Sequence, residues 1–196
     1  MYIDTEHLHY WMQAIRKSKN HQRTLDAFWK GQISSKEWLI NSLEKFIYDP
    51  VSIEIHGGWV GVLSSLIFQS NIPASKILSI DIDQTCKNIA KEMNMLEVME
   101  GRFDVIAKDM CDHVPQSDVI INTSCEHMIQ QDYNRWLDNT NDQLLVLQSN
   151  NYDIEEHVRI AHDLTEFKKQ SNIEIFWSGE LELPLYTRYM LIGKKK

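Results

Sequence analysis

The spacing of hydrophobic residues changes near Pro50, and this change divides the sequence into two parts. Before Pro50, apolar residues recur every three or four positions, which is the period of an amphipathic helix. The first such set is Leu8, Trp11, Met12 and Ile15. We therefore expect residues 1–49 to form a helical extension that packs on a main domain formed by residues 50–196.

Two boundaries are expected inside this extension. Gly31 follows the apolar residues Phe28 and Trp29, and it is expected to end the second helix. Ser34 and Glu37 have the spacing of a capping box, in which each side chain accepts a hydrogen bond from a free backbone N–H group. A third helix is therefore expected to begin near Ser34.

After Pro50, short apolar stretches are separated by segments with helical spacing. The predicted strands are 51–55, 77–82, 103–107, 119–121, 144–147, 173–177 and 186–192. The predicted helix before the sixth strand is long and ends near Lys169, with Ile154, Val158, Ala161 and Leu164 on one face. No helix separates the last two strands. This order predicts an α/β fold with a doubly wound, mainly parallel seven-stranded sheet and an antiparallel C-terminal strand pair.

Composition and charge narrow the possible classes of protein. Of the 196 residues, 43% are hydrophobic and 24% are charged, which is typical of a folded domain. The net charge of −8 argues against a large non-specific footprint on nucleic acid, which needs clustered basic residues. The three cysteines form no Cys-x-x-Cys pair, and no apolar run approaches the roughly 18 residues of a membrane span. We therefore expect a cytoplasmic protein without a signal peptide or membrane span.

The first strand leads into the glycine-rich turn His56-Gly57-Gly58-Trp59-Val60-Gly61. Such a turn between a strand and a helix can bring backbone N–H groups against a ligand, because glycine lacks a Cβ and accepts a positive φ. A tight turn that binds no ligand is the alternative.

Acidic residues at the ends of the next two strands favour a ligand. Asp81 lies about 20 residues after Gly61, the separation at which an acidic residue meets the ribose hydroxyls of a bound nucleoside. Asp109 follows the third strand, where a carboxylate can accept a hydrogen bond from the amine of a base. The alternatives are a helix cap that Asp81 shares with Asp83 and a solvated turn for Asp109. The three features together favour a nucleoside site.

This order of features resembles the class I S-adenosylmethionine-dependent methyltransferases, over about residues 50–193. The resemblance implies S-adenosylmethionine as the cofactor. The cofactor-binding positions that it implies are Glu54, Gly57, Gly58, Trp59, Gly61, Asp81, Ile82, Asp109 and Met110. The usual loop of the family reads acid-x-Gly-x-Gly-x-Gly. Here His56 occupies the first glycine position, and the last glycine is displaced by one residue.

The resemblance also implies a role for each of these positions. The first-strand acid, Glu54, and the glycine loop would hold the methionine and ribose part of the cofactor. Asp81 would bind the ribose diol, with Ile82 beside the adenine. Asp109 would accept from the adenine amine, with Met110 flanking it.

The segment after the fourth strand lines the reaction site in this family, and here it reads Asn122-Thr123-Ser124-Cys125-Glu126-His127-Met128. Methyl transfer is an in-line displacement from a sulfonium, in which positioning matters most. A base is needed only if the acceptor must lose a proton. Glu126 or His127 is the candidate base, and Asn122 is a candidate for orienting the cofactor or the acceptor. A histidine hydrogen-bonded to the backbone at a helix start is the alternative for His127.

Two triplets raise the question of a metal site, namely Cys111-Asp112-His113 and Cys125-Glu126-His127. Adjacent residues in a turn rarely converge on one ion, and neither triplet has a known zinc spacing. We therefore expect no metal. In the N-terminal helices, the histidines and aromatic residues are candidates to cover the acceptor pocket or to contact a second subunit, although packing on the sheet is the expected role of Trp11.

The sequence thus predicts a cytoplasmic S-adenosylmethionine-dependent methyltransferase, with no nucleic-acid or membrane partner indicated. Whether it is a monomer or a homo-oligomer is left open by the sequence. The acidic balance and the lack of an added recognition domain favour a small-molecule acceptor. One alternative is an NAD(P)-dependent oxidoreductase, because His56-x-Gly58-x-x-Gly61 is a dinucleotide fingerprint with its first glycine replaced. The missing second nucleotide-binding half and the helix-free final strand pair argue against it. A non-catalytic protein that keeps the fold is the other alternative.

Overall fold

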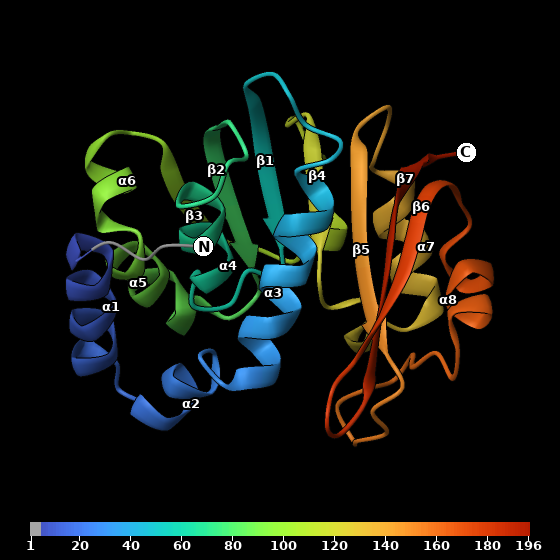
Figure 1. Ribbon diagram of the computed structural model, residues 1–196, viewed down its shortest axis with the longest axis horizontal. Helices are drawn as coiled ribbons and strands as arrows, with labels where there is room; N and C mark the ends of the chain where they lie inside the picture. The colour runs from blue at the N-terminus through green and yellow to red at the C-terminus, as the bar shows by residue number, and fades with distance from the viewer. Residues whose placement is uncertain (1–4) are drawn as a thin grey trace.

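The computed structural model describes residues 5–196 and contains a seven-stranded sheet of order β3-β2-β1-β4-β5-β7-β6 (Figure 1). The strands are β1 (Val51–His56), β2 (Ala74–Asp81), β3 (Phe103–Ala107), β4 (Val119–Asn122), β5 (Leu144–Asn150), β6 (Ile173–Glu182) and β7 (Thr187–Lys195). Strands β1 to β5 are parallel, whereas β7 runs antiparallel to both β5 and β6. The predicted doubly wound sheet with an antiparallel C-terminal pair is confirmed.

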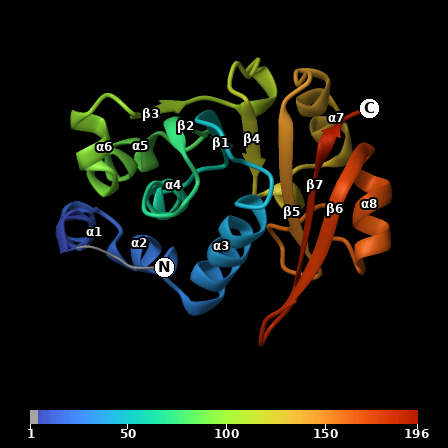
Figure 2. The same ribbon diagram turned by 45° about the horizontal axis from the view of Figure 1, so that its top comes forward.

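Helices lie on both sides of this sheet (Figure 2). They are α1 (Thr5–Lys17), α2 (His21–Asp26), α3 (Lys30–Leu43), α4 (Val62–Phe68), α5 (Gln84–Met93), α6 (Met95–Met99), α7 (Gln130–Asp138) and α8 (Leu164–Ser171). Two short 3-10 turns, Met110–Asp112 and Cys125–His127, follow β3 and β4. No helix among residues 5–196 combines the length and apolar character needed to span a bilayer.

The core consists of two hydrophobic layers, one on each face of the sheet. Because successive strand residues point to opposite faces, neighbours in one strand belong to different layers. Ile121 packs in the layer that includes helices α1, α3, α4 and α5. Ile120 packs in the layer that includes residues of α7 and α8. The central strands are therefore apolar at both faces, as expected for a sheet covered on both sides.

The N-terminal helices share the first of these layers with the sheet. Trp11 is 5% exposed, and its indole Nε1 donates to Ser65 Oγ on α4 at 2.8 Å. Leu39, Ile40 and Leu43 of α3 are buried in the same cluster as Ile53 of β1. The described part of the helical extension, residues 5–49, therefore packs on the main sheet.

The predicted start of the third helix is wrong. Helix α3 begins at Lys30, so Gly31 lies in its first turn and Ser34 lies inside the helix. Gly31 is buried next to Tyr186 and Leu183 of the β6–β7 hairpin. Contact with a distant part of the chain thus overrides the low helix propensity of glycine, which amounts to about 1 kcal/mol.

The long helix predicted through residues 154–169 is also wrong. The observed helix α8 begins only at Leu164, and Asp163 caps it by accepting from the Glu166 N–H. Residues 151–163 contain no helix. The Arg159 N–H donates to the carbonyl of Glu126 at 3.0 Å, and the Ala161 N–H donates to the carbonyl of Asn150 at 3.1 Å. These bonds to strand ends satisfy the backbone of the segment in place of helical bonds.

A buried carboxylate joins β1 to the segment before β4. Glu54 is 2% exposed, and its Oε1 accepts from the N–H groups of Gln116 and Ser117 at 2.8 and 3.1 Å. Its Oε2 lies 2.8 Å from His113 Nε2 and 3.3 Å from His56 Nε2.

Trp136 of α7 extends this network. Its indole Nε1 donates to His56 Nδ1 at 2.6 Å. Since Nδ1 accepts, the proton of the neutral His56 ring is on Nε2, which can donate to Glu54.

We predict that Glu54→Gln destabilises the fold in a pH-dependent way. Burial raises the pKa of Glu54, but hydrogen bonds from His56, Gln116 and His113 outweigh burial and lower it to about 2, from 4.5 in the unfolded chain. A depressed folded pKa means that the stabilisation is present above pH 4.5 and is lost as the pH falls towards 2. Urea unfolding at pH 7 should show a loss of about 3 kcal/mol.

The matched control is Glu37→Gln, at an exposed glutamate of α3. Its stability should follow that of the wild type from pH 7 to pH 2.5, whereas Glu54→Gln should lose less stability over this range. Equal pH dependence in the two variants would contradict the assigned role of Glu54.

Candidate active site

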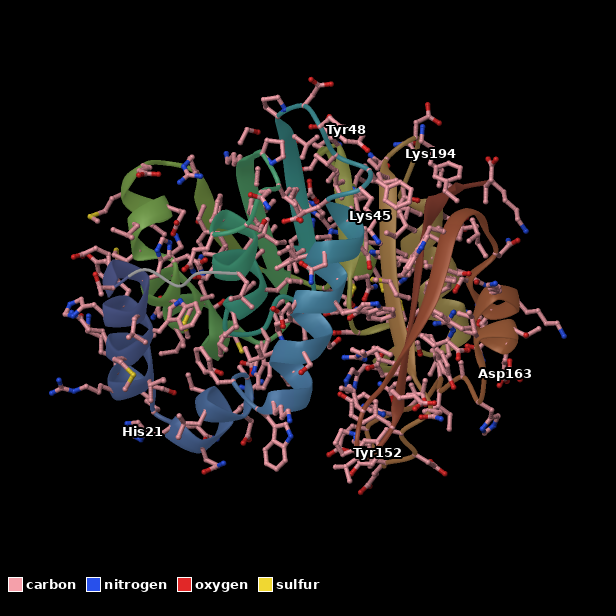
Figure 3. All side chains as sticks on the ribbon, viewed as in Figure 1. His21, Lys45, Tyr48, Tyr152, Asp163 and Lys194 are labelled. Atoms are coloured by element: carbon pink, nitrogen blue, oxygen red, sulfur yellow. The ribbon has the colours of Figure 1, made fainter. Side chains whose placement is uncertain are left out.

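A cavity of about 730 Å³ lies at the C-terminal ends of β1, β2, β3 and β4. This is the edge at which open α/β sheets bind ligands, and the volume is in the range of small-molecule sites. Residues from α2, α3 and the segment after β5 complete the lining. Tyr152, one of the lining residues, is at this lower edge in Figure 3, far from Tyr48 at the opposite edge.

The turn after β1 lines the cavity through Gly57, Gly58 and Trp59. Gly57 and Gly61 have φ values of +71° and +80°, which glycine adopts without strain. A Cβ at Gly58 would overlap the Ser79 side chain of β2. Glycine is therefore required at these positions by the path of the turn.

The N–H groups of this turn are largely satisfied within the protein, which differs from the expectation that they face a ligand. Gly57 and Gly58 donate to the carbonyl of Ile80 at 2.9 and 3.1 Å, and Gly61 donates to the carbonyl of Gly58 at 3.0 Å. The Trp59 N–H donates to Asp81 at 2.8 Å. The turn thus shapes the wall of the cavity but offers a ligand few hydrogen-bond donors.

Asp81 lines the cavity at the end of β2. Its Oδ2 accepts from Trp59, and its Oδ1 accepts from the Asp83 N–H at 2.9 Å. Each carboxylate oxygen retains a second lone pair for a ligand. Asp83 caps α5 by accepting from the Thr85 N–H, so Asp81 does not act as that cap. Ile82 also lines the cavity and is 74% exposed, an unusual state for a large apolar side chain.

Asp109 and Met110 line the cavity after β3. Asp109 Oδ1 accepts from the Cys111 N–H at 2.8 Å and so caps the 3-10 turn. The rest of the carboxylate is partly exposed, with Arg135 Nη2 at 3.8 Å from Oδ2. The structure therefore brings the residues after strands β1, β2 and β3 together around one cavity.

Three residues assigned to the site from the sequence, Glu54, Gly61 and Asn122, do not line the cavity. Glu54 is held in the buried network with His56 and His113. Asn122 is fully buried. Its Oδ1 accepts from the Ser124 N–H at 2.9 Å, and this bond supports the loop after β4. Glu54 is thus held by a distant segment, whereas Asn122 is held mainly within its own loop through Ser124 and Met128.

Glu126 and His127 do line the cavity. Glu126 is 2% exposed, and its Oε1 accepts from Asn150 and Arg188, each at 2.6 Å. Its buried Oε2 has no hydrogen-bond partner among residues 5–196. His127 is exposed, and its Nδ1 lies 3.1 Å from the carbonyl oxygen of Glu156. The backbone bond expected of His127 as an alternative to catalysis is thus present.

The two cysteine-containing triplets lie in different surroundings. His113 bonds to Glu54, whereas His127 faces the cavity. Burial raises the pKa of the Cys111 thiol to about 11 and that of the Cys125 thiol to about 12. Both thiols are therefore protonated at neutral pH, which removes them as nucleophiles.

Sequence reasoning missed several residues of the cavity. They are Arg23, Gln32, Lys36, Tyr152, His157, Tyr186 and Arg188. Arg188 carries a detectable signal, because a buried arginine within an apolar strand needs a polar partner. The α1 residues proposed as a cover instead bind elsewhere, Trp11 to Ser65 and His7 to Glu97. The cover is provided by α2 and α3.

Comparison with known proteins identifies the fold. No family model and no curated protein matches the sequence. Among solved structures, the chain is similar to magnesium protoporphyrin IX methyltransferase from Synechocystis PCC 6803 with bound S-adenosylhomocysteine. The TM-score is 0.67 at 12% identity, covering 100% of this chain and 97% of the other.

Two further structures are similar. For the 1,6-didemethyltoxoflavin-N1-methyltransferase of Burkholderia thailandensis, the TM-score is 0.66 at 13% identity, covering 100% of this chain and 92% of the other. For the pyocyanin biosynthetic protein PhzM, the TM-score is 0.64 at 13% identity, covering 94% of this chain and 61% of the other. This chain thus spans less than two thirds of PhzM. At such identities the likeness shows the fold, and the expected class I methyltransferase fold is confirmed.

Lys36 in the cavity wall gives a testable pH dependence. Burial lowers the pKa of Lys36 from 10.5 to about 7, and the Arg188 guanidinium adds to this effect. Between pH 7 and 10.5 the unfolded chain then binds a proton that the folded chain does not, so stability rises with pH across this window. We predict that Lys36→Met is more stable than the wild type at pH 7 by about 1 kcal/mol or more. The gain should shrink at pH 9.5 in urea unfolding.

Lys45→Met is the control, because Lys45 is exposed just after the C-terminal end of α3 (Figure 3). It should leave the stability near that of the wild type at both pH values. If Lys36→Met were less stable than the wild type at pH 7, the prediction would be contradicted. The hydrogen bonds of the Lys36 amine in the folded protein would then outweigh the cost of burying it.

Proposed function

We propose that the protein is an S-adenosylmethionine-dependent methyltransferase that acts on a small-molecule acceptor. The observation that carries the proposal is one cavity in which Asp81, the exposed side chain of Ile82 and the Asp109–Met110 pair adjoin the glycine turn. These groups match the ribose, the adenine ring and the adenine amine of the cofactor. Two similar structures, the protoporphyrin and toxoflavin methyltransferases, contain S-adenosylhomocysteine.

The side chains would divide the binding of the cofactor among them. The free lone pairs of Asp81 would accept from the two ribose hydroxyls. Ile82 would lose its exposure to water by packing on the adenine, which is worth about 1.5–3 kcal/mol for a large apolar side chain. Asp109 would accept from the adenine amine beside Met110. In this proposal Glu54 and Asn122 support the loops and do not contact the cofactor.

The acceptor would occupy the part of the cavity between α3 and the β6–β7 hairpin. This wall carries the stacked rings of Tyr152 and Tyr186, whose centroids are 5.5 Å apart, together with Lys36 and Arg188. Aromatic faces flanked by a few polar groups suit a small organic molecule. The methyl carbon would be attacked in line by an acceptor lone pair, with the cavity supplying orientation. Glu126 or His127 would accept a proton from an acceptor that must lose one.

The first test is a calorimetric titration with S-adenosylhomocysteine of the wild type, Asp81→Asn and Asp104→Asn. We expect micromolar binding to the wild type, equivalent to about −8 kcal/mol. Asp81→Asn should weaken binding about 10-fold or more, because hydrogen bonds to a charged group contribute about 1.5–3 kcal/mol. Asp104→Asn should bind like the wild type, because Asp104 is an exposed residue of β3 outside the cavity lining.

Absence of binding by a folded wild-type protein would reject the proposal. Thermal stabilisation by NADH, with none by S-adenosylhomocysteine, would favour the oxidoreductase. Cofactor binding without methyl transfer to any of a panel of hydroxyl, amine and thiol acceptors would favour a non-catalytic protein with the methyltransferase fold.

A further inference from the structure

Three side chains of types that can ligate a metal lie in the cavity wall after β4 and β5, whereas Asp81 lies at the end of β2. Glu126 and His127 come from the 3-10 turn after β4, and His157 comes from the irregular segment after β5. All three line the cavity. One carboxylate oxygen and one nitrogen of each imidazole lie within 4.8 Å of one another. Residues about 30 positions apart in the sequence are thus brought to one point.

The hydrogen bonds of the two histidines fix their tautomers. His127 Nδ1 lies 3.1 Å from the carbonyl oxygen of Glu156, and His157 Nδ1 lies 2.6 Å from the carbonyl oxygen of Tyr152. A carbonyl oxygen only accepts, so each Nδ1 carries a proton. In the neutral ring, Nε2 then has a free lone pair. Donation from the other ring nitrogen to a carbonyl is the usual arrangement of a metal-bound histidine.

Glu126 contributes a carboxylate oxygen that the protein leaves unsatisfied. Its side chain is 3% exposed, and its Oε1 is held by Arg188 and Asn150. Its buried Oε2 has no partner among the described residues. A buried acceptor without a partner costs free energy, and a bound cation would remove this cost. The bond from Arg188 fixes the carboxylate without using Oε2.

A second group, Glu54, His56 and His113, meets the same proximity criterion but differs chemically. Trp136 donates to His56 Nδ1, so a neutral His56 holds its proton on Nε2 and has no lone pair there. Both oxygens of Glu54 already have partners. This group is complete without an ion, whereas the group in the cavity is not.

We propose that Glu126, His127 and His157 bind a divalent transition-metal ion. Two imidazole nitrogens and one carboxylate oxygen suit Zn²⁺, Mn²⁺, Fe²⁺ or Co²⁺ better than Ca²⁺ or Mg²⁺, which prefer ligand sets made of oxygen alone. Coordination at about 2.0–2.2 Å requires the ligands to move closer together. His127 is exposed at the end of the 3-10 turn, and His157 is partly exposed in the irregular segment after β5. The remaining coordination positions face the cavity.

The metal site itself is independent of the proposed function, but its use in catalysis rests on that function. With Glu126 and His127 engaged as ligands, neither would act as the base. An ion in this wall would instead bind a hydroxyl or phenol acceptor and lower its pKa, with the proton released to solvent. The acceptor oxygen would then form a bond to the methyl carbon. The carbon–sulfur bond would break, and sulfur would keep the electron pair. The site therefore points to an oxygen acceptor.

The test is a titration of EDTA-treated, dialysed protein with Co²⁺, followed by visible absorption, and then displacement with Zn²⁺. The wild type should bind one equivalent. His127→Ala and His157→Ala should each weaken Co²⁺ binding about 100-fold. Loss of a residue that merely supports a metal ligand weakens metal binding by about 10- to 100-fold, and loss of a ligand should reach the upper end of that range. His162→Ala, at an exposed histidine five residues after His157, should bind like the wild type. Circular dichroism should show that all variants are folded.

Unchanged Co²⁺ affinity in both His127→Ala and His157→Ala would overturn the proposal. Loss of the ion in His113→Ala alone would also overturn it, because the ion would then be at the Glu54 group. A parallel titration of the metal-free protein with S-adenosylhomocysteine separates the two proposals. If the wild type binds the cofactor but not Co²⁺, the metal site alone is rejected. If the wild type binds Co²⁺ and both histidine variants do not, the metal site is supported even when no cofactor binds.

Discussion

The buried carboxylate of Glu54 is the interaction on which the arrangement of the cavity depends. A charge in the interior is tolerated only when it is paired and hydrogen-bonded, and Glu54 obtains its partners from β1 itself and from residues 113–117. Through His56 the network reaches Trp136 of α7. The end of β1 is thereby fixed against the segment that leads into β4. Since the turns after both strands line the cavity, the network sets the distance between the two halves of the site.

His56, in the place of the first glycine, changes what the turn can do. The side chain is fully buried and belongs to the Glu54 network. The residues that follow donate their N–H groups to Ile80 and Asp81 of β2. A turn fixed in this way offers a ligand room to approach but few donors. In the proposed function, recognition of the nucleoside would then depend on side chains at the ends of β2 and β3, and the exposure of Ile82 at this point is consistent with that division.

The sequence predicted the parts of the structure that depend on local pattern. The strands, the missing helix between the last two strands and the positions of Asp81 and Asp109 all follow from residue spacing within one element and its turn. The prediction did not anticipate the buried position of Glu54, because its partners are distant in the chain. It also did not anticipate that Asn122 is buried and bonded within its own loop. It also placed residues 151–163 in a helix from their apolar spacing. That segment instead bonds to Glu126 and Asn150, and local propensity carries no information about such contacts.

In the proposed function, the irregular segment 151–163 distinguishes the acceptor side of the cavity from the cofactor side. Arg159 holds it in place, because its guanidinium donates to the carbonyls of Cys125 and Gln170 at 3.2 and 3.0 Å and covers the ring of Tyr133 at 4.0 Å. The backbone of the segment bonds to Glu126 and Asn150 in place of helical bonds. By remaining non-helical, the segment brings His157 to Glu126 and Tyr152 to Tyr186. In the proposed function, the cofactor side is thus built from strand ends, whereas the acceptor side is built from long-range contacts of this segment and of the β6–β7 hairpin. Acceptor specificity would then depend on this segment and on the hairpin.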